Sequence, residues 1–247
     1  MRTFKPLLLA SSLALMASPM LAVADDSPWD ASASLSYVLQ NGNSKSEALN
    51  GKVGVGYQWN KWSISFKGEG GSTRTRKAST RVEERTAEKY YLELREDRSL
   101  TDADFLYHLT TYLNDNFTAY AYQLNDSLGY GRKLINNEVH KLEAEIGPGF
   151  RLREYRGPGY TEKDATLHVG VKYLWQISES TEFREILQDD IARGGDYTVR
   201  NEVGLSTMLN SRLAFDVSHV LVRNSVVPVG TKNSDSTVTV SLTYKFK

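Results

Sequence analysis

Apolar and polar residues alternate with a period of two along most of the chain after residue 30. Between Leu49 and Trp59, for example, Val53, Val55 and Tyr57 occupy alternate positions, and polar or small residues stand between them. Successive side chains of a β-strand point to opposite faces, so this period predicts strands with one apolar and one polar face. Segments rich in Asn, Gly, Ser and charged residues separate the alternating runs and predict turns.

The alternating runs predict an all-β fold of about twelve antiparallel strands of roughly ten residues, the length that a tilted strand needs to cross a bilayer. An even number of strands is typical of single-chain outer-membrane barrels. The run 182–188 has the least regular alternation. The polar segments that are expected to be longer loops are 70–87, 114–118, 154–164, 189–196 and 224–235.

Two features favour a transmembrane barrel over a soluble sandwich. Short expected turns, such as 60–61, alternate with longer loops, as the two ends of membrane barrels do. Aromatic residues recur on the apolar faces at strand ends, where they would form rings at the headgroup levels. Those beside short turns or the C-terminus are Tyr57, Trp59, Trp62, Phe105, Tyr173, Trp175, Tyr244 and Phe246. A soluble lipocalin-like barrel, with the faces reversed, remains an alternative.

The polar faces carry many ionisable residues. A transmembrane barrel places such residues in its lumen, since polar groups cannot face lipid unpaired. Because both signs of charge are present, we expect ion pairs across a narrow lumen rather than a path lined with one sign. The predicted lumen residues are Lys52, Glu93, Lys141, Glu143, Glu145, Arg153, Lys172 and Asp216, together with Lys67, Arg95, Arg151 and His168.

The N-terminus predicts export. Two basic residues precede an apolar run that ends at the small-residue pattern Ala22-Val23-Ala24, and Asp25 follows directly. This order of features predicts a Sec-type signal peptide, and the run is too short for a transmembrane anchor. The expected organisation is a signal peptide over residues 1–24, a short segment over 25–30 and one outer-membrane barrel over 31–247.

Composition narrows the function classes. Removing the signal peptide leaves 247 − 24 = 223 residues and takes away two of the 30 basic side chains, so the formal charge becomes 28 − 30 = −2. This balance suggests neither a nucleic-acid partner nor an acidic substrate. The chain has no Cys, which excludes thiol catalysis and disulfides. No later apolar run reaches 18 residues, so no transmembrane helix is expected.

Three segments resemble a known family. Gln40–Ser46, Gly129–Arg132 and Glu145–Arg151 are similar to the YdiY-like, salt-induced outer-membrane proteins, a domain family of unknown function, and the likeness spans almost all of residues 31–247. The resemblance implies an outer-membrane barrel and a link to salt or osmotic stress, with no known substrate, cofactor or catalytic residue. The motif positions are Gly42, Asn43, Ser44, Gly147, Pro148, Gly149 and Arg151, of which Gly-Pro-Gly is the most specific piece.

Pro148 stands on the apolar face of an expected strand. Proline removes a donor from the hydrogen-bond ladder, so with glycine on both sides it predicts a bulge or bend. The alternative is a kink that shapes the lumen or an assembly signal.

No catalytic pattern is found. None of the four His residues stands at a metal-ligand spacing, and no phosphate-binding glycine loop is present. We therefore expect no enzyme, metal or cofactor, and the leading function is a narrow channel or a structural envelope barrel. A barrel-embedded lipid- or sugar-modifying enzyme is an alternative, which would need Ser, His and an orienting polar residue together on the outer wall. A soluble periplasmic binding barrel is another.

The expected partners are those of an outer-membrane barrel. Lipid would surround the wall, and basic side chains of the segment 72–89 could contact lipopolysaccharide phosphates, although a solvated loop of mixed charge is the simpler interpretation. Periplasmic chaperones and the barrel assembly machinery would act on the unfolded chain. The expected assembly strand alternates up to a terminal aromatic, which Lys247 follows as a departure from the usual pattern; its outward residues are Val240, Leu242, Tyr244 and Phe246.

Overall fold

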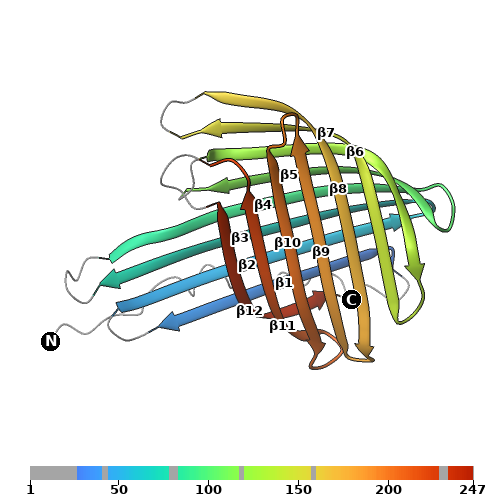
Figure 1. Cartoon of the computed structure of the whole chain (residues 1–247). Helices are drawn as coiled ribbons and strands as arrows, with labels where there is room; N and C mark the ends of the chain where they lie inside the picture. Colours follow the sequence, from blue (N-terminus) through green and yellow to red (C-terminus); the bar gives the residue numbers. More distant parts are fainter. Residues whose placement is uncertain are drawn as a thin grey trace.

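Twelve β-strands form one closed antiparallel barrel in the computed structural model, which describes residues 27–40, 44–77, 83–116, 120–156, 160–227 and 233–246 (Figure 1). Each strand pairs with its neighbours in sequence, and β1 pairs with β12. The predicted all-β class and strand number are therefore confirmed. The strands are β1 (Trp29–Gln40), β2 (Ser44–Trp59), β3 (Trp62–Lys77), β4 (Glu83–Ser99), β5 (Asp104–Asp115), β6 (Tyr120–Asn136), β7 (His140–Tyr155), β8 (Thr161–Ser178), β9 (Thr181–Ala192), β10 (Tyr197–Met208), β11 (Leu213–Asn224) and β12 (Ser234–Phe246).

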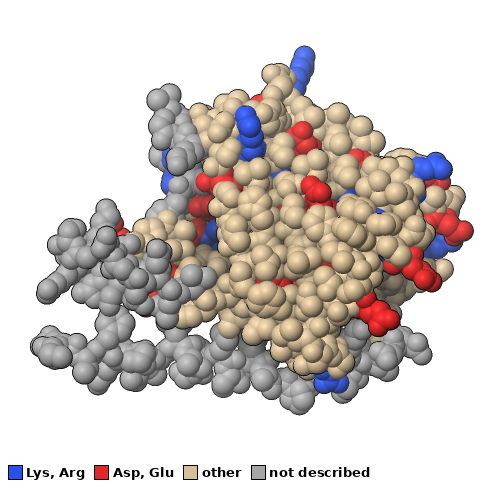
Figure 2. Space-filling view, turned by 60° about the horizontal axis from the view of Figure 1, so that its bottom comes forward, with Lys and Arg blue, Asp and Glu red and all other residues tan. Residues whose placement is uncertain are grey.

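The barrel wall separates apolar from polar side chains. Outward positions hold many exposed Leu, Val, Phe, Tyr and Trp side chains, such as Leu128 and Val240. On the face shown in Figure 2, most of the surface belongs to residues other than Lys, Arg, Asp and Glu. The charged residues are densest at one end of the view. The inward positions are mostly polar, and their buried uncharged members include Ser36, Thr111, Gln123, Ser127, Thr166, Thr198, Ser218 and Thr243. No helix among the described residues could span a membrane.

The first and last strands close the barrel. Five register pairs join them, from Ala31 with Phe246 to Leu35 with Leu242. This pairing removes the two open edges that the sheet would otherwise have. The predicted C-terminal assembly strand is thus the strand that closes the barrel.

The strands extend further into polar sequence than the alternation predicts. β3 continues to Lys77 and β4 begins at Glu83, so the predicted loop 70–87 is wrong for most of its length. β9 runs to Ala192, where a loop from residue 189 is predicted. These polar ends stay paired, with one register shift between Thr73 and Arg74 of β3, because backbone hydrogen bonds join neighbouring strands whatever the side chains are. The strand bounds leave two to four residues between strands at one end and three to nine at the other, a smaller contrast than predicted.

The orientation of β5 corrects a second prediction. Phe105 is expected on the outer face, but Phe105, Tyr107 and Leu109 are buried inside the barrel as one apolar cluster. Both faces of β5 are partly apolar, so alternation alone leaves the orientation open. Glycines of β6 provide the space: an added Cβ at Gly129 would lie 2.7 Å from the Tyr107 ring, and one at Gly131 would overlap the ring of Phe105.

Pro148 does not mark the predicted bulge. It pairs with Leu167 of β8, and on the β6 side the ladder is interrupted between the pairs Ser127–Gly149 and Tyr130–Ile146 without a change of register. The glycine before it allows a close approach of two strands, since a Cβ at Gly147 would lie 2.5 Å from the Cα of Gly129. The Gly-Pro-Gly segment is therefore a site of tight strand contact, and the prediction of a bulge is wrong.

Candidate functional site

A carboxylate of β10 anchors an ion-pair network in the lumen. Glu202 is 2% exposed, and the Nζ atom of Lys67 lies 2.9 Å from its Oε2 atom. β3 and β10 are five strands apart in a ring of twelve, so this ion pair spans the lumen (Figure 1). The other cations within 3.5 Å of the same carboxylate are Lys52, Arg184 and Arg200. We call Glu202 and these four cations the Glu202 network.

Side chains of β3 and β4 extend the Glu202 network. Glu69 of β3 forms ion pairs with Lys67 at 3.0 Å and with Arg200 at 3.4 Å. The guanidinium of Arg200 lies 4.3 Å from the centre of the Tyr91 ring, which favours a cation over its face. The Tyr91 hydroxyl in turn donates to Glu93 at 2.6 Å. The predicted lumen residues Lys52 and Glu93 thus lie in one connected layer.

A second network joins β4, β7, β8 and β9. Arg95 donates to both carboxylate oxygens of Glu145, at 3.0 and 2.7 Å. His168 lies between Glu145 and Asp190, with Nε2 3.3 Å from Glu145 Oε1 and Nδ1 2.8 Å from Asp190 Oδ1. The imidazole is 2% exposed, so protein groups rather than water satisfy it. We call these four residues the His168 network.

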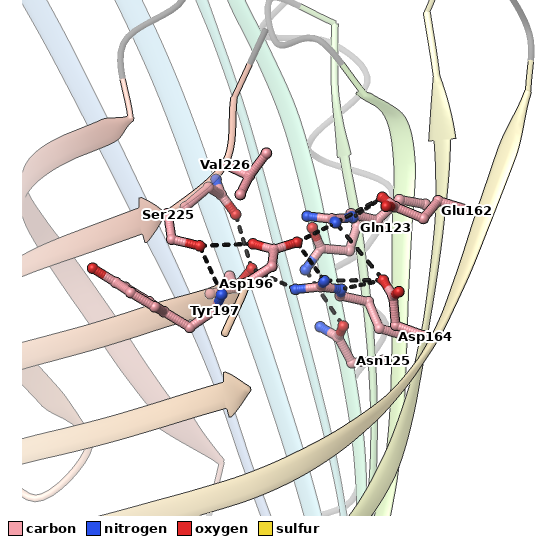
Figure 3. A network of polar contacts seen from close by, with 12 residues as sticks. Gln123, Asn125, Glu162, Asp164, Asp196, Tyr197, Ser225 and Val226 are labelled. Atoms are coloured by element: carbon pink, nitrogen blue, oxygen red, sulfur yellow. Dashed lines mark hydrogen bonds and ion pairs between the residues drawn. The ribbon is translucent and has the colours of Figure 1, made fainter. Parts of the chain in front are cut away.

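A third group of ion pairs lies near the end of the barrel that has the longer connections. Arg151 and Arg153 are both fully buried and approach the same oxygen of Asp196, at 2.7 and 2.5 Å. Arg151 also binds Asp164 at 3.0 Å, and Arg153 binds Glu162 at 2.7 Å. Figure 3 shows Asp196 facing the Glu162 and Asp164 side of the barrel, with the two cationic groups between them. We call these five residues the mouth clamp.

A short connection brings Asp196 into the mouth clamp. Gly194 and Gly195 have φ angles of +97° and +86°, a backbone region that favours glycine, and Asp196 follows them directly before β10. Ser225 donates its hydroxyl to Asp196 Oδ1 at 2.7 Å. Burial opposes the charge, but hydrogen bonds from Ser225 and Arg153 and the charges of the two arginines hold the pKa of Asp196 below its ordinary value. Asp196 is therefore a stable anion at neutral pH.

The space left between these networks is small. A cavity of about 40 Å³ is lined by Tyr91, His168 and Arg200, among others. Another of about 140 Å³ lies nearer the short turns and is lined by Arg95 and Glu145 of the His168 network, together with Glu143 and Lys172. A cavity needs roughly 10–15 Å³ of such space to hold one water, so both cavities can hold water. The side chains of the three networks extend into the lumen around these cavities.

The predicted site residues fall into four groups. Those that join the networks described above are Lys52, Lys67, Glu93, Arg95, Glu145, Arg151, Arg153 and His168. Asp216 faces inward and accepts a hydrogen bond from Thr243. Glu143 lines the larger cavity, and Lys141 and Lys172 are largely exposed. Of the remaining predicted residues, those outside the described residues are Ala22, Ala24, Asp25, Gly42 and Asn43.

Several central residues are missed by the sequence analysis. Arg200 and Glu202 alternate with Val199 and Val203, and this signal could have placed them in the lumen. Asp196 lies in a connection, where no period applies, and nothing in the sequence points to its role. The other missed members are Glu69, Glu162, Asp164, Arg184 and Asp190.

The other three histidines lie on the outer wall. His140 bonds Tyr173, and His219 bonds the hydroxyl of Ser236 at 2.8 Å. A hydrolytic triad needs a third group that orients the imidazole. In the described parts of the chain, no carboxylate bonds His219, and no cluster of His, Asp and Glu is arranged to hold a metal ion.

A closed barrel with an apolar outer wall and a charged lumen defines a transmembrane β-barrel protein. Within this class, the chain belongs to the family described as "Protein of unknown function, DUF481", which matches residues 33–246. Over 218 residues it is 26% identical to the "Uncharacterized protein YdiY" of Escherichia coli (strain K12). The aligned region covers 88% of this chain and 83% of that protein. The family resemblance drawn from the sequence motifs is thus confirmed.

Solved structures support the fold assignment. The barrel is similar to the NanC porin, with a TM-score of 0.50, 10% identity, and coverage of 89% of this chain and 99% of that one. It is also similar to the COG4313 outer membrane channel of Pseudomonas putida F1, with a TM-score of 0.50, 10% identity, and coverage of 92% and 98%. At such low identity the likeness extends to the fold alone.

Proposed function

We propose that this protein lies in the outer membrane and forms a narrow channel that its own ion pairs hold closed, without enzymatic activity. The observation that carries the proposal is the ion pair between Lys67 and Glu202, which joins opposite sides of the lumen at 2.9 Å. The mouth clamp provides a second constriction nearer the longer connections. Relatives in fold include a porin and an outer membrane channel, which agrees with a role in permeation.

The mouth clamp also supplies a physical link to salt. Its carboxylates Glu162, Asp164 and Asp196 are 35%, 22% and 17% exposed, so dissolved ions can approach them. The Debye length falls from about 8 Å at 0.15 M to about 3 Å at 1 M ionic strength, which screens the solvent-facing side of these carboxylates more than it screens the buried guanidiniums. We therefore propose that high salt loosens the clamp and raises the open probability, a response suited to salt or osmotic stress.

Single-channel recording in planar bilayers tests this function. The wild-type protein is expected to give rare, small openings with weak ion selectivity, and to open more often as KCl rises from roughly 0.15 to 1 M. Changing Arg151 and Arg153 together to Ala removes the mouth clamp and should raise the conductance at low salt, while the ion pair between Lys67 and Glu202 remains as the inner constriction. Lys163→Ala is a control, since Lys163 is an exposed cation on β8 outside the clamp.

Two outcomes would contradict the closed-channel proposal. Large, stable and strongly selective wild-type openings would indicate a dedicated open pore. Silence of both the wild type and the double Arg variant, with both proteins inserted, would indicate a purely structural role in the envelope.

Location and assembly form a separate part of the proposal. We infer that the barrel assembly machinery receives this chain through β12, after periplasmic chaperones have kept it unfolded, and that lipopolysaccharide surrounds the longer connections. Deleting residues 244–247 removes three of the five register pairs that close the barrel. The truncated chain should stay in the periplasm, where it aggregates or is degraded. Its normal insertion, seen in membrane fractionation and heat-modifiable gel mobility, would contradict this role of β12.

A further inference from the structure

Three ionisable side chains stand together on the outer wall, where most neighbours are apolar. Glu96 of β4, His108 of β5 and Asp126 of β6 are 43%, 38% and 47% exposed. His108 Nε2 lies 3.0 Å from Asp126 Oδ2, and its Nδ1 lies 3.8 Å from Glu96 Oε2. Thr110 donates its hydroxyl to the same Asp126 oxygen at 2.7 Å. We call these four residues the wall cluster.

Asp126 of the wall cluster lies near mid-height of the apolar band, whereas Glu96 lies three residues from the end of β4. On the outward face of β6, Asp126 is four residues from both Tyr122 and Tyr130, with a Leu on either side of it. At a rise of about 3.3 Å per residue, each Tyr is roughly 13 Å away along the strand. Aromatic residues mark the two headgroup levels of membrane barrels, and the apolar band between them is about 25 Å tall. Asp126 is thus placed where lipid chains, and not headgroups, would meet it.

Part of the hydrogen-bonding capacity of the wall cluster is unused. Glu96 lies beyond hydrogen-bond distance of His108, and it has no other partner among the described residues. Asp126 uses its Oδ2 atom for both His108 and Thr110, which leaves Oδ1 free within the described part of the chain. Lipid chains offer no donors, so polar groups at this depth are retained where another surface covers them.

We propose that the wall cluster is the centre of an interface between two copies of this chain, which lie side by side in the membrane about a two-fold axis. Such an interface brings the same patch of each copy together, so the patch must complement itself. The wall cluster does so, because it holds the donors His108 and Thr110 beside the acceptors Glu96 and Asp126.

The charge of the wall cluster is compatible with this pairing. Two carboxyl groups that face each other across the axis can share one proton, and they then form a hydrogen bond that needs no outside cation. A bound metal ion is a poorer explanation, since the His108 ring stands between the two carboxylates, with Nε2 bonded to Asp126 and Nδ1 facing Glu96 at 3.8 Å. The exposed apolar side chains that would pack around the cluster and exclude lipid are Leu94, Leu106 and Leu128.

Single-cysteine crosslinking tests the proposal, because the chain has no Cys of its own. Leu128→Cys places a thiol opposite His108 in the strand register, on a side chain position that is 58% exposed. Val240→Cys is the matched control, since Val240 is 47% exposed on β12, six strands away. The purified full chain is reconstituted in liposomes at low protein density and treated with a short bismaleimide. We expect the Leu128→Cys protein to form dimers at least ten times more than the control.

A second variant separates the wall cluster from the apolar wall around it. Replacing Glu96, His108 and Asp126 by Leu in the Leu128→Cys protein should reduce the dimer to the control value, while heat-modifiable gel mobility reports a folded barrel. Equal dimer from Leu128→Cys and Val240→Cys would overturn the proposal, as would undiminished dimer in the Leu-substituted variant. Crosslinking in native membranes to a different protein, without the dimer, would show that the second copy is not the occupant.

Discussion

The lumen and the outer wall hold charged groups in opposite ways. In the lumen, Glu202 is 2% exposed and meets four cations from four strands. On the wall, Asp126 is 47% exposed and meets one imidazole and one hydroxyl, both from the neighbouring strand. The difference follows from curvature. Strands on opposite sides of a closed barrel face each other across the lumen, whereas on the convex wall a side chain reaches adjoining strands alone. Closing the barrel therefore brings the lumen charges into ion pairs with one another, whereas the wall charges need a partner outside the chain to complete their hydrogen bonds.

Removing the central lumen carboxylate should have the largest effect on stability. Glu202→Gln removes the most buried anion of the network and leaves Glu69 as the one shared by Lys52, Lys67 and Arg200. Breaking a buried ion pair costs about 3–5 kcal/mol. The free energy of unfolding, measured by urea titration in liposomes, should fall by that amount. Glu179→Gln, at an exposed turn between β8 and β9, is the control and should leave it unchanged. A loss below about 1 kcal/mol for Glu202→Gln would mean that the lumen network does not hold the barrel together.

The same contrast explains which features could be predicted from the sequence. Period-two alternation predicts strands wherever one face is apolar and the other polar, which holds for β2 and β8. It fails at β5, where both faces are partly apolar and the space beside Gly129 and Gly131 decides the orientation. It also fails at the ends of β3 and β4, since polar strands outside the apolar band keep their backbone pairs without any apolar signal.

Prediction of the site follows the same limits. Arg151 and Arg153 are predicted as lumen residues because they alternate with Phe150 and Leu152. Their partner Asp196 comes from a connection whose path depends on two glycines with positive φ, and no periodic signal exists there. The wall cluster did leave a signal, because Asp126 shares a face with two Leu residues and interrupts their pattern. A charged residue on an apolar face is therefore worth treating as a candidate site.

Overfilling the lumen should have the next largest effect. In Gly129→Ala, the new methyl group would lie 2.7 Å from the Tyr107 ring and closer still to a backbone oxygen of β7, so the inner wall must shift. Overpacking of this kind costs about 1–3 kcal/mol. Gly204→Ala is the matched control on β10, where the nearest atom would be the Arg184 guanidinium at 3.5 Å. Equal urea midpoints for the two variants would contradict the tight contact between Tyr107 and β6.

The mouth clamp should respond to acid at an unusually low pH. Because the pKa of Asp196 is lowered in the folded protein, its contribution is fully present above the ordinary Asp value of about 4 and is lost as pH falls through the lowered value. The open probability should thus stay constant from about pH 8 to 5 and rise below about 4. Asp196→Asn should open the channel at every pH and remove this dependence. A rise near neutral pH in bilayer recordings would assign the response to another group.

The smallest effect is expected on the outer wall, and it should have the opposite sign. Replacing both His108 and Asp126 by Leu exchanges polar groups at lipid depth for apolar ones. At protein densities below the one used for crosslinking, where the chain is monomeric, the free energy of unfolding should rise slightly, by less than about 1 kcal/mol, since exposed acidic groups on a barrel wall cost less than Arg or Lys do. At high density the free energy of unfolding of the wild type should rise to that of the double Leu variant, because a second copy then covers its wall cluster. If the double Leu variant instead loses as much stability as Glu202→Gln when monomeric, the wall cluster serves the barrel itself, and the contrast between lumen and wall fails.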